Sequence, residues 1–121
     1  MKNIAVIGSG TMGNGIAHVF AQNGFSVSLI DIKQDALDKA ISTISANLDR
    51  MISKGTISED VKTSTLSNLK TFTSLKDGVA QSDLVVEAAT ENISIKLDLF
   101  RELDSYCQPD TILASNTSSI S

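Results

Sequence analysis

The sequence predicts an α/β fold in which a mostly parallel, doubly wound sheet is covered by helices on both faces. Short apolar runs alternate with amphipathic segments along the whole chain, and near-continuous apolar runs are typical of strands buried on both sides. The first run leads directly into a G-x-G-x-x-G pattern, and the second run ends at an aspartate. This order indicates right-handed crossovers and a Rossmann-type sheet.

The expected strands are each bounded by a turn or helix signal. The first strand, Ile4 to Ile7, is followed by a helix from Met12 to Gln22 that ends at Asn23-Gly24. Pro109 closes the last helix before the final strand. The later strands are expected at residues 26–30, 69–74, 83–89 and 111–115, and two helical segments at 75–81 and 92–106.

A helical hairpin is expected as an insertion after the second strand. Its long helix stops at Lys54-Gly55, and Thr56 with Glu59 forms a T-x-x-E capping box for a second, shorter helix that carries Val61, Leu66 and Leu69. In the long helix, apolar residues recur at the spacing of one face of a 3.6-residue period. These residues are Leu37, Ile41, Ile44, Leu48 and Met51.

The composition fits one folded domain and excludes several classes of protein. The chain has 121 residues, of which 41% are hydrophobic and 20% charged, with a single proline, and this argues against disorder. A net charge of −4 without a basic cluster disfavours nucleic acid as a partner. No apolar run approaches the ~18 residues of a membrane span. Because Cys107 has no cysteine partner, a reducing, cytoplasmic location is expected.

The glycines of the G-x-G-x-x-G pattern have distinct expected roles. Gly8 permits a tight turn, Gly10 lets the backbone approach a pyrophosphate, and Gly13 allows close packing of helix on strand. The first turn of the helix presents N–H groups to the phosphates. A glycine-rich turn that binds nothing is the alternative, which the surrounding strand, helix and acid disfavour. The expected cofactor-binding residues of this loop are Gly8, Ser9, Gly10, Thr11, Met12 and Gly13.

Asp31, at the end of the second strand, predicts which dinucleotide binds. Its carboxylate can accept hydrogen bonds from both hydroxyls of the adenosine ribose, and its charge would repel a 2′-phosphate. NAD is therefore favoured over NADP as the cofactor. Lys33, two residues further on, blurs this preference because its side chain could reach such a phosphate. No metal site is expected.

The only histidine, His18, is not expected to be a catalytic base. A base must reach the proton that it removes, whereas His18 follows the phosphate-binding loop, and the nicotinamide lies at the opposite end of the cofactor from the adenosine. A packed or partly exposed helix histidine is the better interpretation. Glu87 and Glu91 flank the end of the fourth strand and either contact the cofactor or cap the next helix. Cys107 is expected to be structural.

Two further runs, "LVVEAATEN" and "ASNTSSIS", complete a pattern that the glycines alone do not make specific. With them, the chain resembles the N-terminal NAD-binding domain of the L-3-hydroxyacyl-CoA dehydrogenase family, and most of all its bacterial 3-hydroxybutyryl-CoA members. The resemblance covers the whole chain, including the hairpin. It implies NAD-dependent oxidation of an L-3-hydroxyacyl-CoA, with 3-hydroxybutyryl-CoA as the expected substrate, to the 3-oxoacyl-CoA in fatty-acid or butanoate metabolism.

The resemblance also implies roles for residues beyond the glycine loop. Glu91 and Lys96 match positions that contact NAD around the nicotinamide ribose. Ser118 matches a residue between nicotinamide and substrate, where it can hydrogen-bond the 3-hydroxyl, and it is the catalytic candidate of this chain. Asn116 is its expected neighbour at the cofactor. The alternative for Ser118 is a turn residue at the end of a strand.

In the family, the hairpin binds the coenzyme A moiety of the substrate. Lys54 matches a lysine that contacts it, and Asn47 lies on the same face about two turns earlier. A lysine at the end of a helix is also favoured by the helix dipole without any ligand. Lys54, Asn47 and Ser118 are therefore the expected substrate-binding residues, with an acyl-CoA as the partner.

The catalytic base of the family is a histidine in an H-F-x-N-P motif, which these 121 residues do not contain. The family also has a helical C-terminal domain that carries the dimer interface. Residues 1–121 are therefore expected to form an NAD-binding domain that is incomplete at its C-terminus and inactive alone, from a protein that is a homodimer at full length. The alternatives are a related dehydrogenase of a 3-hydroxy acid without CoA, or a non-catalytic NAD-binding protein.

Overall fold

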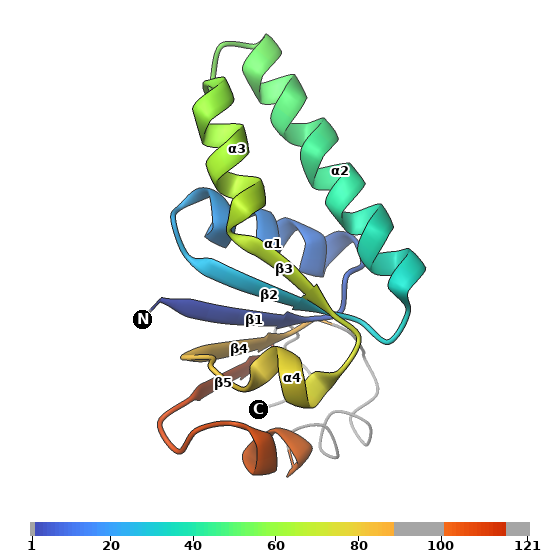
Figure 1. The fold of residues 1–121 in the computed structure, drawn as a ribbon, viewed down its shortest axis with the longest axis vertical. Coiled ribbons are helices and arrows are strands. Elements are labelled where there is room, and N and C mark those ends of the chain that lie inside the picture. The colour runs from blue at the N-terminus through green and yellow to red at the C-terminus, as the bar shows by residue number, and fades with distance from the viewer. Residues whose placement is uncertain (1, 89–100, 116–121) are drawn as a thin grey trace.

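A parallel sheet forms the centre of the molecule (Figure 1). The computed structural model describes residues 2–88 and 101–115. Within them, a five-stranded sheet has the order β3-β2-β1-β4-β5, and every neighbouring pair is parallel. The chain moves outward from β1 to β3 and then crosses back to β4, so the strand order reverses between β1 and β4. The strands are β1 (Asn3–Ile7), β2 (Ser26–Ile30), β3 (Leu69–Phe72), β4 (Leu84–Glu87) and β5 (Ile112–Ser115).

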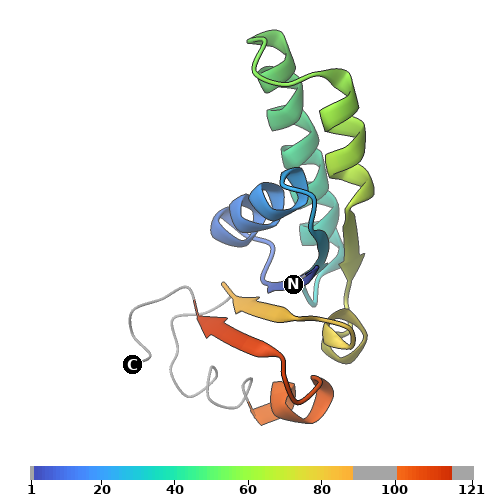
Figure 2. The same ribbon diagram turned by 90° about the vertical axis from the view of Figure 1, so that its left-hand side faces the viewer.

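Helices lie on both faces of this sheet (Figure 2), as expected for a doubly wound fold. The helix α1 (Thr11–Gln22) packs on one face together with the start of α2 (Gln34–Ser53). The other face carries the short α4 (Leu75–Val79) and a helical segment at residues 101–106. The helix α3 (Glu59–Ser67) pairs with α2 to form the hairpin.

The strand β1 contributes to two separate hydrophobic cores because its side chains alternate between the two faces. Ile4 and Val6 pack with α1 and α2, whereas Ala5 and Ile7 pack on the side of α4. All four are buried. Burial on both faces explains why the sequence of this strand is a continuous apolar run.

The amino ends of β1 and β4 are joined through Asp83. Its Oδ2 accepts hydrogen bonds from the backbone N–H groups of Lys2, at 2.8 Å, and Asn3, at 2.9 Å. These two hydrogen bonds hold the pKa of this carboxyl below its usual range. An ionised Asp83 therefore accepts hydrogen bonds from two N–H groups at the amino end of β1, the central strand.

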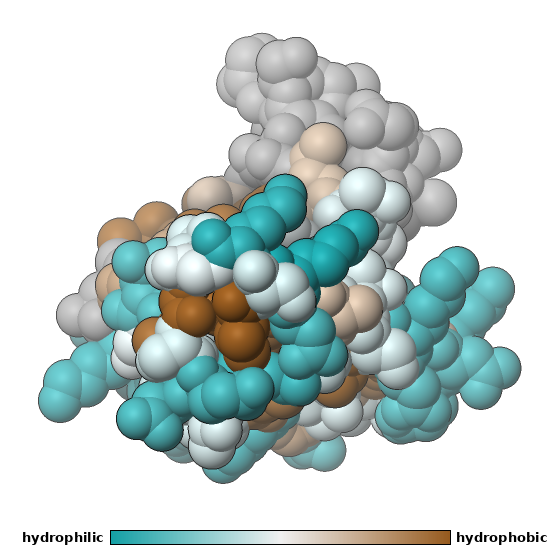
Figure 3. Space-filling model, turned by 90° about the horizontal axis from the view of Figure 1, so that it is seen from above, coloured by the Kyte–Doolittle hydropathy of each residue, from teal (hydrophilic) through white to brown (hydrophobic). Residues whose placement is uncertain are grey.

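The hairpin of α2 and α3 projects away from the sheet (Figure 1). Its predicted inner face is confirmed, since Leu37, Ile44 and Leu48 are fully buried, and Ile41 and Met51 are half-buried. Lys62 of α3 forms an ion pair with Asp49 of α2 at 2.6 Å. Figure 3, which looks onto the end of the hairpin, shows apolar residues gathered among hydrophilic ones.

The capping box predicted at Thr56 is wrong. The N–H of Thr56 instead donates to the carbonyl of Met51 and so helps to end α2, next to Gly55, whose φ is 77°. The cap of α3 is Ser58, whose hydroxyl accepts a hydrogen bond from the N–H of Val61. The sequence predicts Leu69 both in the second hairpin helix and at the start of the third strand; it is the first residue of β3, so the strand assignment is confirmed and the helix assignment is wrong.

Other elements follow the predicted order with small shifts. The second strand has the predicted bounds, and α1 begins one residue earlier than expected, at Thr11. The fourth strand is shorter than expected and ends at Glu87. Most of the helix predicted at 92–106 lies outside the described residues. In the part of the chain that the structure describes, no helix combines the length and apolar character needed to cross a membrane.

Candidate functional site

The loop from β1 to α1 begins with a tight turn at Gly8. Its φ of 99° lies in the left-handed region that favours glycine, and its N–H donates to the carbonyl of Ile30 at 2.7 Å. This hydrogen bond links the carboxyl ends of β1 and β2. Gly10 caps α1 without a side chain, and no acidic residue occupies the first turn. The positive end of the helix is therefore open to an anion.

Gly13 is required by the packing of α1 on the loop. A Cβ atom at this position would lie 1.7 Å from the carbonyl oxygen of Gly8, so no side chain fits, and the predicted packing role is confirmed. A Cβ atom at Gly10 would meet nothing within 4 Å. Gly10 therefore borders open space, which its proposed approach to a pyrophosphate needs.

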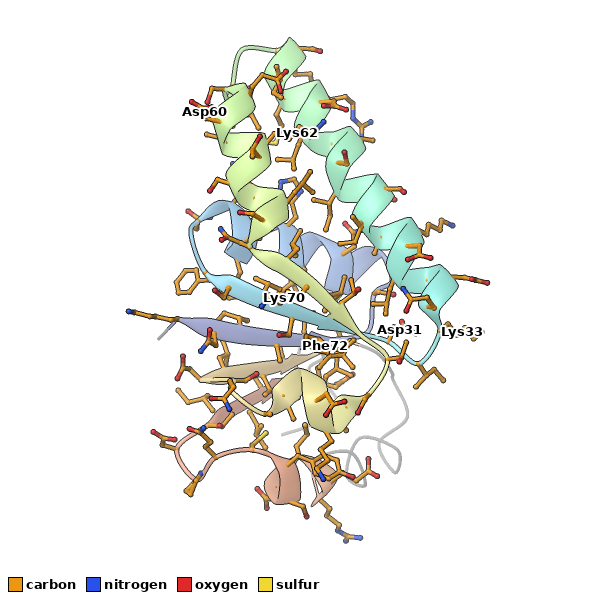
Figure 4. All side chains as sticks on the ribbon, in the orientation of Figure 1. Asp31, Lys33, Asp60, Lys62, Lys70 and Phe72 are labelled. Carbon is orange, nitrogen blue, oxygen red and sulfur yellow. The ribbon has the colours of Figure 1, made fainter. Side chains whose placement is uncertain are left out.

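Asp31 follows β2 directly and lies beside the start of α2, with Lys33 near it (Figure 4). Its Oδ2 accepts hydrogen bonds from the N–H of Ser9, at 3.1 Å, and from the Oγ of Ser9, at 2.8 Å. Its Oδ1 accepts from the N–H of Lys33 at 3.0 Å. The acid at the end of the second strand is thus fixed directly to the glycine loop.

The protonation of Asp31 depends on two opposing effects. Desolvation by burial, the largest single effect, raises the pKa of the carboxyl, but the hydrogen bonds from Lys33 and Ser9 and the positive charge of Lys33 together outweigh it. The net pKa is lower than usual. Asp31 is therefore ionised at neutral pH and able to accept hydrogen bonds from a ligand.

A groove of about 720 Å³ runs between the glycine loop and α2. Ser9, Gly10 and Asp31 lie on one side, and Lys39, Thr43 and Asn47, one turn apart, lie on α2. The two helices are tied beneath it by the buried Asn14, whose Nδ2 donates to the carbonyl of Ala40 at 2.9 Å.

The groove also includes a residue that the sequence analysis did not single out. Ile32 follows Asp31, lines the groove and is 86% exposed, although a large apolar side chain is normally covered. The only available signal was its place directly after the acid, and its exposure could not be predicted from that. An apolar surface next to Asp31 suits a flat, apolar ligand group.

The two residues expected to bind coenzyme A lie on α2 but differ in their surroundings. Asn47 is half-buried, lines the groove, and accepts a hydrogen bond through Oδ1 from the guanidinium of Arg50. Lys54 is the exposed C-cap of α2, and its N–H donates to the carbonyl of Arg50 at 3.0 Å. The structure therefore brings Asn47, but not Lys54, to the same groove as Asp31.

The remaining candidates divide into described and undescribed residues. His18 is half-buried on α1, and its Nε2 lies 2.8 Å from Oε1 of Gln22, as expected for a structural helix histidine. Cys107 is half-buried, and burial, with the charge of Asp104, raises the pKa of its thiol, which fits a structural role.

Glu87 is fully buried at the end of β4. The predictions for Glu91, Lys96, Asn116 and Ser118 fall outside the described residues.

Residues 3–121 match the model of one protein family, described as 3-hydroxyacyl-CoA dehydrogenase, NAD binding domain. The chain belongs to this family of NAD-binding domains. The predicted resemblance and the Rossmann-type fold are thereby confirmed, and NAD is the cofactor of the family. Among the described ranges 2–88 and 101–115, no group of His, Cys, Asp and Glu is arranged to hold a metal ion.

Relatives of the NAD-binding domain are dehydrogenases. The chain is 46% identical to a 3-hydroxybutyryl-CoA dehydrogenase of Bradyrhizobium diazoefficiens, over 100% of this chain and 41% of that protein. A crystal structure of a 3-hydroxybutyryl-CoA dehydrogenase from Escherichia coli superposes with a TM-score of 0.96 and 44% identity, over 99% of this chain and 25% of that one. The corresponding enzyme from Ralstonia eutropha gives a TM-score of 0.94 and 40% identity, over 100% of this chain and 42% of that one. The chain thus spans less than half the length of these relatives.

The close contact between Gly13 and Gly8 predicts the effect of a single methyl group. In Gly13→Ala, the added Cβ would overlap the Gly8 carbonyl, so α1 must move away from β1. We expect the free energy of unfolding to fall by about 1–3 kcal/mol or more, measured as a lower urea midpoint.

Gly15→Ala is the matched control, because its Cβ would meet nothing within 4 Å in the same helix. Alanine is the better helix former by about 1 kcal/mol, so this variant should be as stable as the original protein or more stable. Equal urea midpoints for the two variants would contradict the packing role of Gly13.

Proposed function

We propose that the chain is the NAD-binding domain of an enzyme that oxidises an L-3-hydroxyacyl-CoA to the 3-oxoacyl-CoA. The observation that carries this proposal is the groove in which an open helix end, a glycine loop and an ionised Asp31 face the same space. It lies where the carboxyl ends of the strands meet, the usual ligand position in open α/β sheets. The names of the relatives support the reaction and its substrate class.

Each part of the groove suits one part of NAD. The loop from Gly8 to Gly13 and the first turn of α1 would hold the pyrophosphate, because backbone N–H groups and the helix dipole favour negative charge. Asp31 would accept a hydrogen bond from the adenosine ribose through Oδ1. The N–H of Lys33 occupies only one of the two lone-pair sites of this oxygen. The exposed Ile32 would lie against the adenine. When bound, NAD supplies the acceptor for the hydride.

The residues nearest the reaction are proposed on resemblance. Glu91 and Lys96 would contact NAD near the nicotinamide ribose, and Asn116 would lie beside it. Ser118 would hydrogen-bond the 3-hydroxyl of the substrate and so fix the carbon that loses its hydride. The proton of that hydroxyl would go to a histidine in an H-F-x-N-P motif, which is not among these 121 residues.

The hairpin is proposed to contact coenzyme A. Lys54 is exposed at the end of α2, where an ammonium group is free to meet a phosphate, and Asn47 faces the groove from the same helix. We take 3-hydroxybutyryl-CoA as the substrate because the relatives reported above carry that name. A homodimer in the cytoplasm is the matching proposal for the full-length enzyme.

The first test is NAD binding without turnover by the 121-residue chain. Calorimetric titration with NAD should give a saturable heat, whereas 3-hydroxybutyryl-CoA and NAD together should produce no NADH absorbance, because the proposed proton acceptor is missing. The absence of any NAD affinity would refute the cofactor site. NADH formation above the rate without protein would refute the proposal that the reaction needs the histidine of the H-F-x-N-P motif.

The Asp31→Asn variant tests the ribose site. Asparagine retains a carbonyl that accepts hydrogen bonds but loses the charge, so NAD should bind about tenfold more weakly. NADP should gain relative to NAD, because the repulsion of its 2′-phosphate is removed. Titration of both dinucleotides against both proteins gives the ratio of the two affinities. An unchanged ratio would contradict the role of Asp31.

The Lys54→Ala variant tests the coenzyme A site. Loss of an exposed ammonium that contacts a phosphate should weaken binding of 3-hydroxybutyryl-CoA about fivefold and leave NAD binding unchanged. Lys70→Ala is the matched control, because Lys70 is also exposed but lies on β3 and not on the hairpin that is proposed to contact coenzyme A. Equal affinities of the two variants for the acyl-CoA would favour a substrate without CoA.

A further inference from the structure

Ser9, the second residue of the glycine loop, is buried and tied to Asp31. It is 6% exposed, and both of its hydrogen-bond donors point to the same atom, Oδ2 of Asp31. A backbone N–H alone would be enough to attach the loop to the acid. The second hydrogen bond, from the Ser9 hydroxyl at 2.8 Å, therefore does more than attach the loop: it fixes the direction of the hydroxyl proton.

The acceptor capacity of Asp31 is almost filled by the protein itself. An ionised carboxylate has about four lone-pair sites. The N–H and hydroxyl of Ser9 occupy the two sites on Oδ2, and the N–H of Lys33 occupies one on Oδ1. One site is left, on Oδ1, whereas an adenosine ribose offers two hydroxyl donors.

The Ser9 hydroxyl supplies the missing acceptor. Because its proton is directed to Asp31, its oxygen can only accept further hydrogen bonds. Ser9 and Asp31 also line the same groove. We propose that Ser9 Oγ and Asp31 Oδ1 together form the acceptor pair for the two ribose hydroxyls, so that Ser9 is a second specificity-determining residue. This inference rests on the proposed binding of NAD.

The same pair discriminates against a 2′-phosphate in two ways. The phosphate carries negative charge next to the carboxylate, and it replaces a hydroxyl donor by acceptor oxygens. While its proton is committed to Asp31, Ser9 cannot turn to donate to that phosphate. The cations that line the groove, Lys33 and Lys39, are left as its only charged partners among the described residues of the groove wall.

The Ser9→Ala variant is the direct test, by calorimetric titration with NAD and NADP. It should bind NAD about tenfold more weakly, because one acceptor is lost and the carboxylate is less firmly held. NADP binding should change less, so the ratio of the two affinities narrows. Ser67→Ala is the matched control. The Ser67 hydroxyl donates to the carbonyl of Ser64 within α3, and Ser67 does not line the groove.

Two further measurements separate this role from a general effect on the loop. Loss of a donor to the charged carboxylate raises the pKa of Asp31, so the acid limb of NAD binding should move to higher pH in Ser9→Ala. In an Asp31→Ala background, Ser9→Ala should cost much less affinity, because the two residues act as a pair. Both results would show that Ser9 acts through its hydrogen bond to Asp31, whereas an effect on the loop that bypasses Asp31 would make the two losses additive; the acceptor role of Ser9 Oγ itself is tested with ligand analogues.

Ligand analogues identify the hydroxyl that Ser9 accepts. For one of the two analogues, 2′-deoxy-NAD or 3′-deoxy-NAD, the Ser9→Ala change should cost much less affinity than it costs for NAD, because the hydroxyl that Ser9 accepts is already absent. The inference is overturned if Ser9→Ala binds NAD as tightly as before or more tightly, or if both analogues still show the full loss. Because the original protein must bind NAD in every arm, failure of the proposed function would appear separately, as no binding by any variant.

Discussion

The approach of α1 to the turn after β1 is the contact on which the rest of the structure depends. Only hydrogen at the Cα of Gly13 allows the helix to pass the Gly8 carbonyl. That proximity directs the end of α1 at the loop and brings Asn14 within reach of the Ala40 carbonyl on α2. The groove therefore exists because α1 meets the turn without a side chain between them and is tied to α2 by the side chain of Asn14.

The two hydrophobic cores stabilise this arrangement from opposite faces of the sheet. Because β1 is buried on both sides, its carboxyl end is held in register with β2 and β4 at once. The polar residues of the groove begin where those registers end. The buried strands thus position the loop, which is how function is commonly placed on α/β sheets.

Much of the fold could be predicted from the sequence, because local signals and tertiary packing agree from β1 to β2. The capping of α3 could not, because Thr56 and Ser58 are both good cap residues, and the choice depends on how Gly55 ends α2. The presence of Asn47 and Asp31 in the same groove depends on how α2 runs along it, which the sequence does not show. The hydrogen bond from Ser9 to Asp31 depends on a side-chain orientation that no spacing records.

Backbone hydrogen bonds extend from the loop across the sheet. Gly8 donates to Ile30 on β2, and the N–H of Asp31 donates to Phe72 at the end of β3. A ligand that holds Asp31 and the loop therefore also restrains the ends of three strands, including the edge strand β3. Ligand occupancy and folding become linked equilibria, and amide exchange at these strand ends should slow as the groove fills.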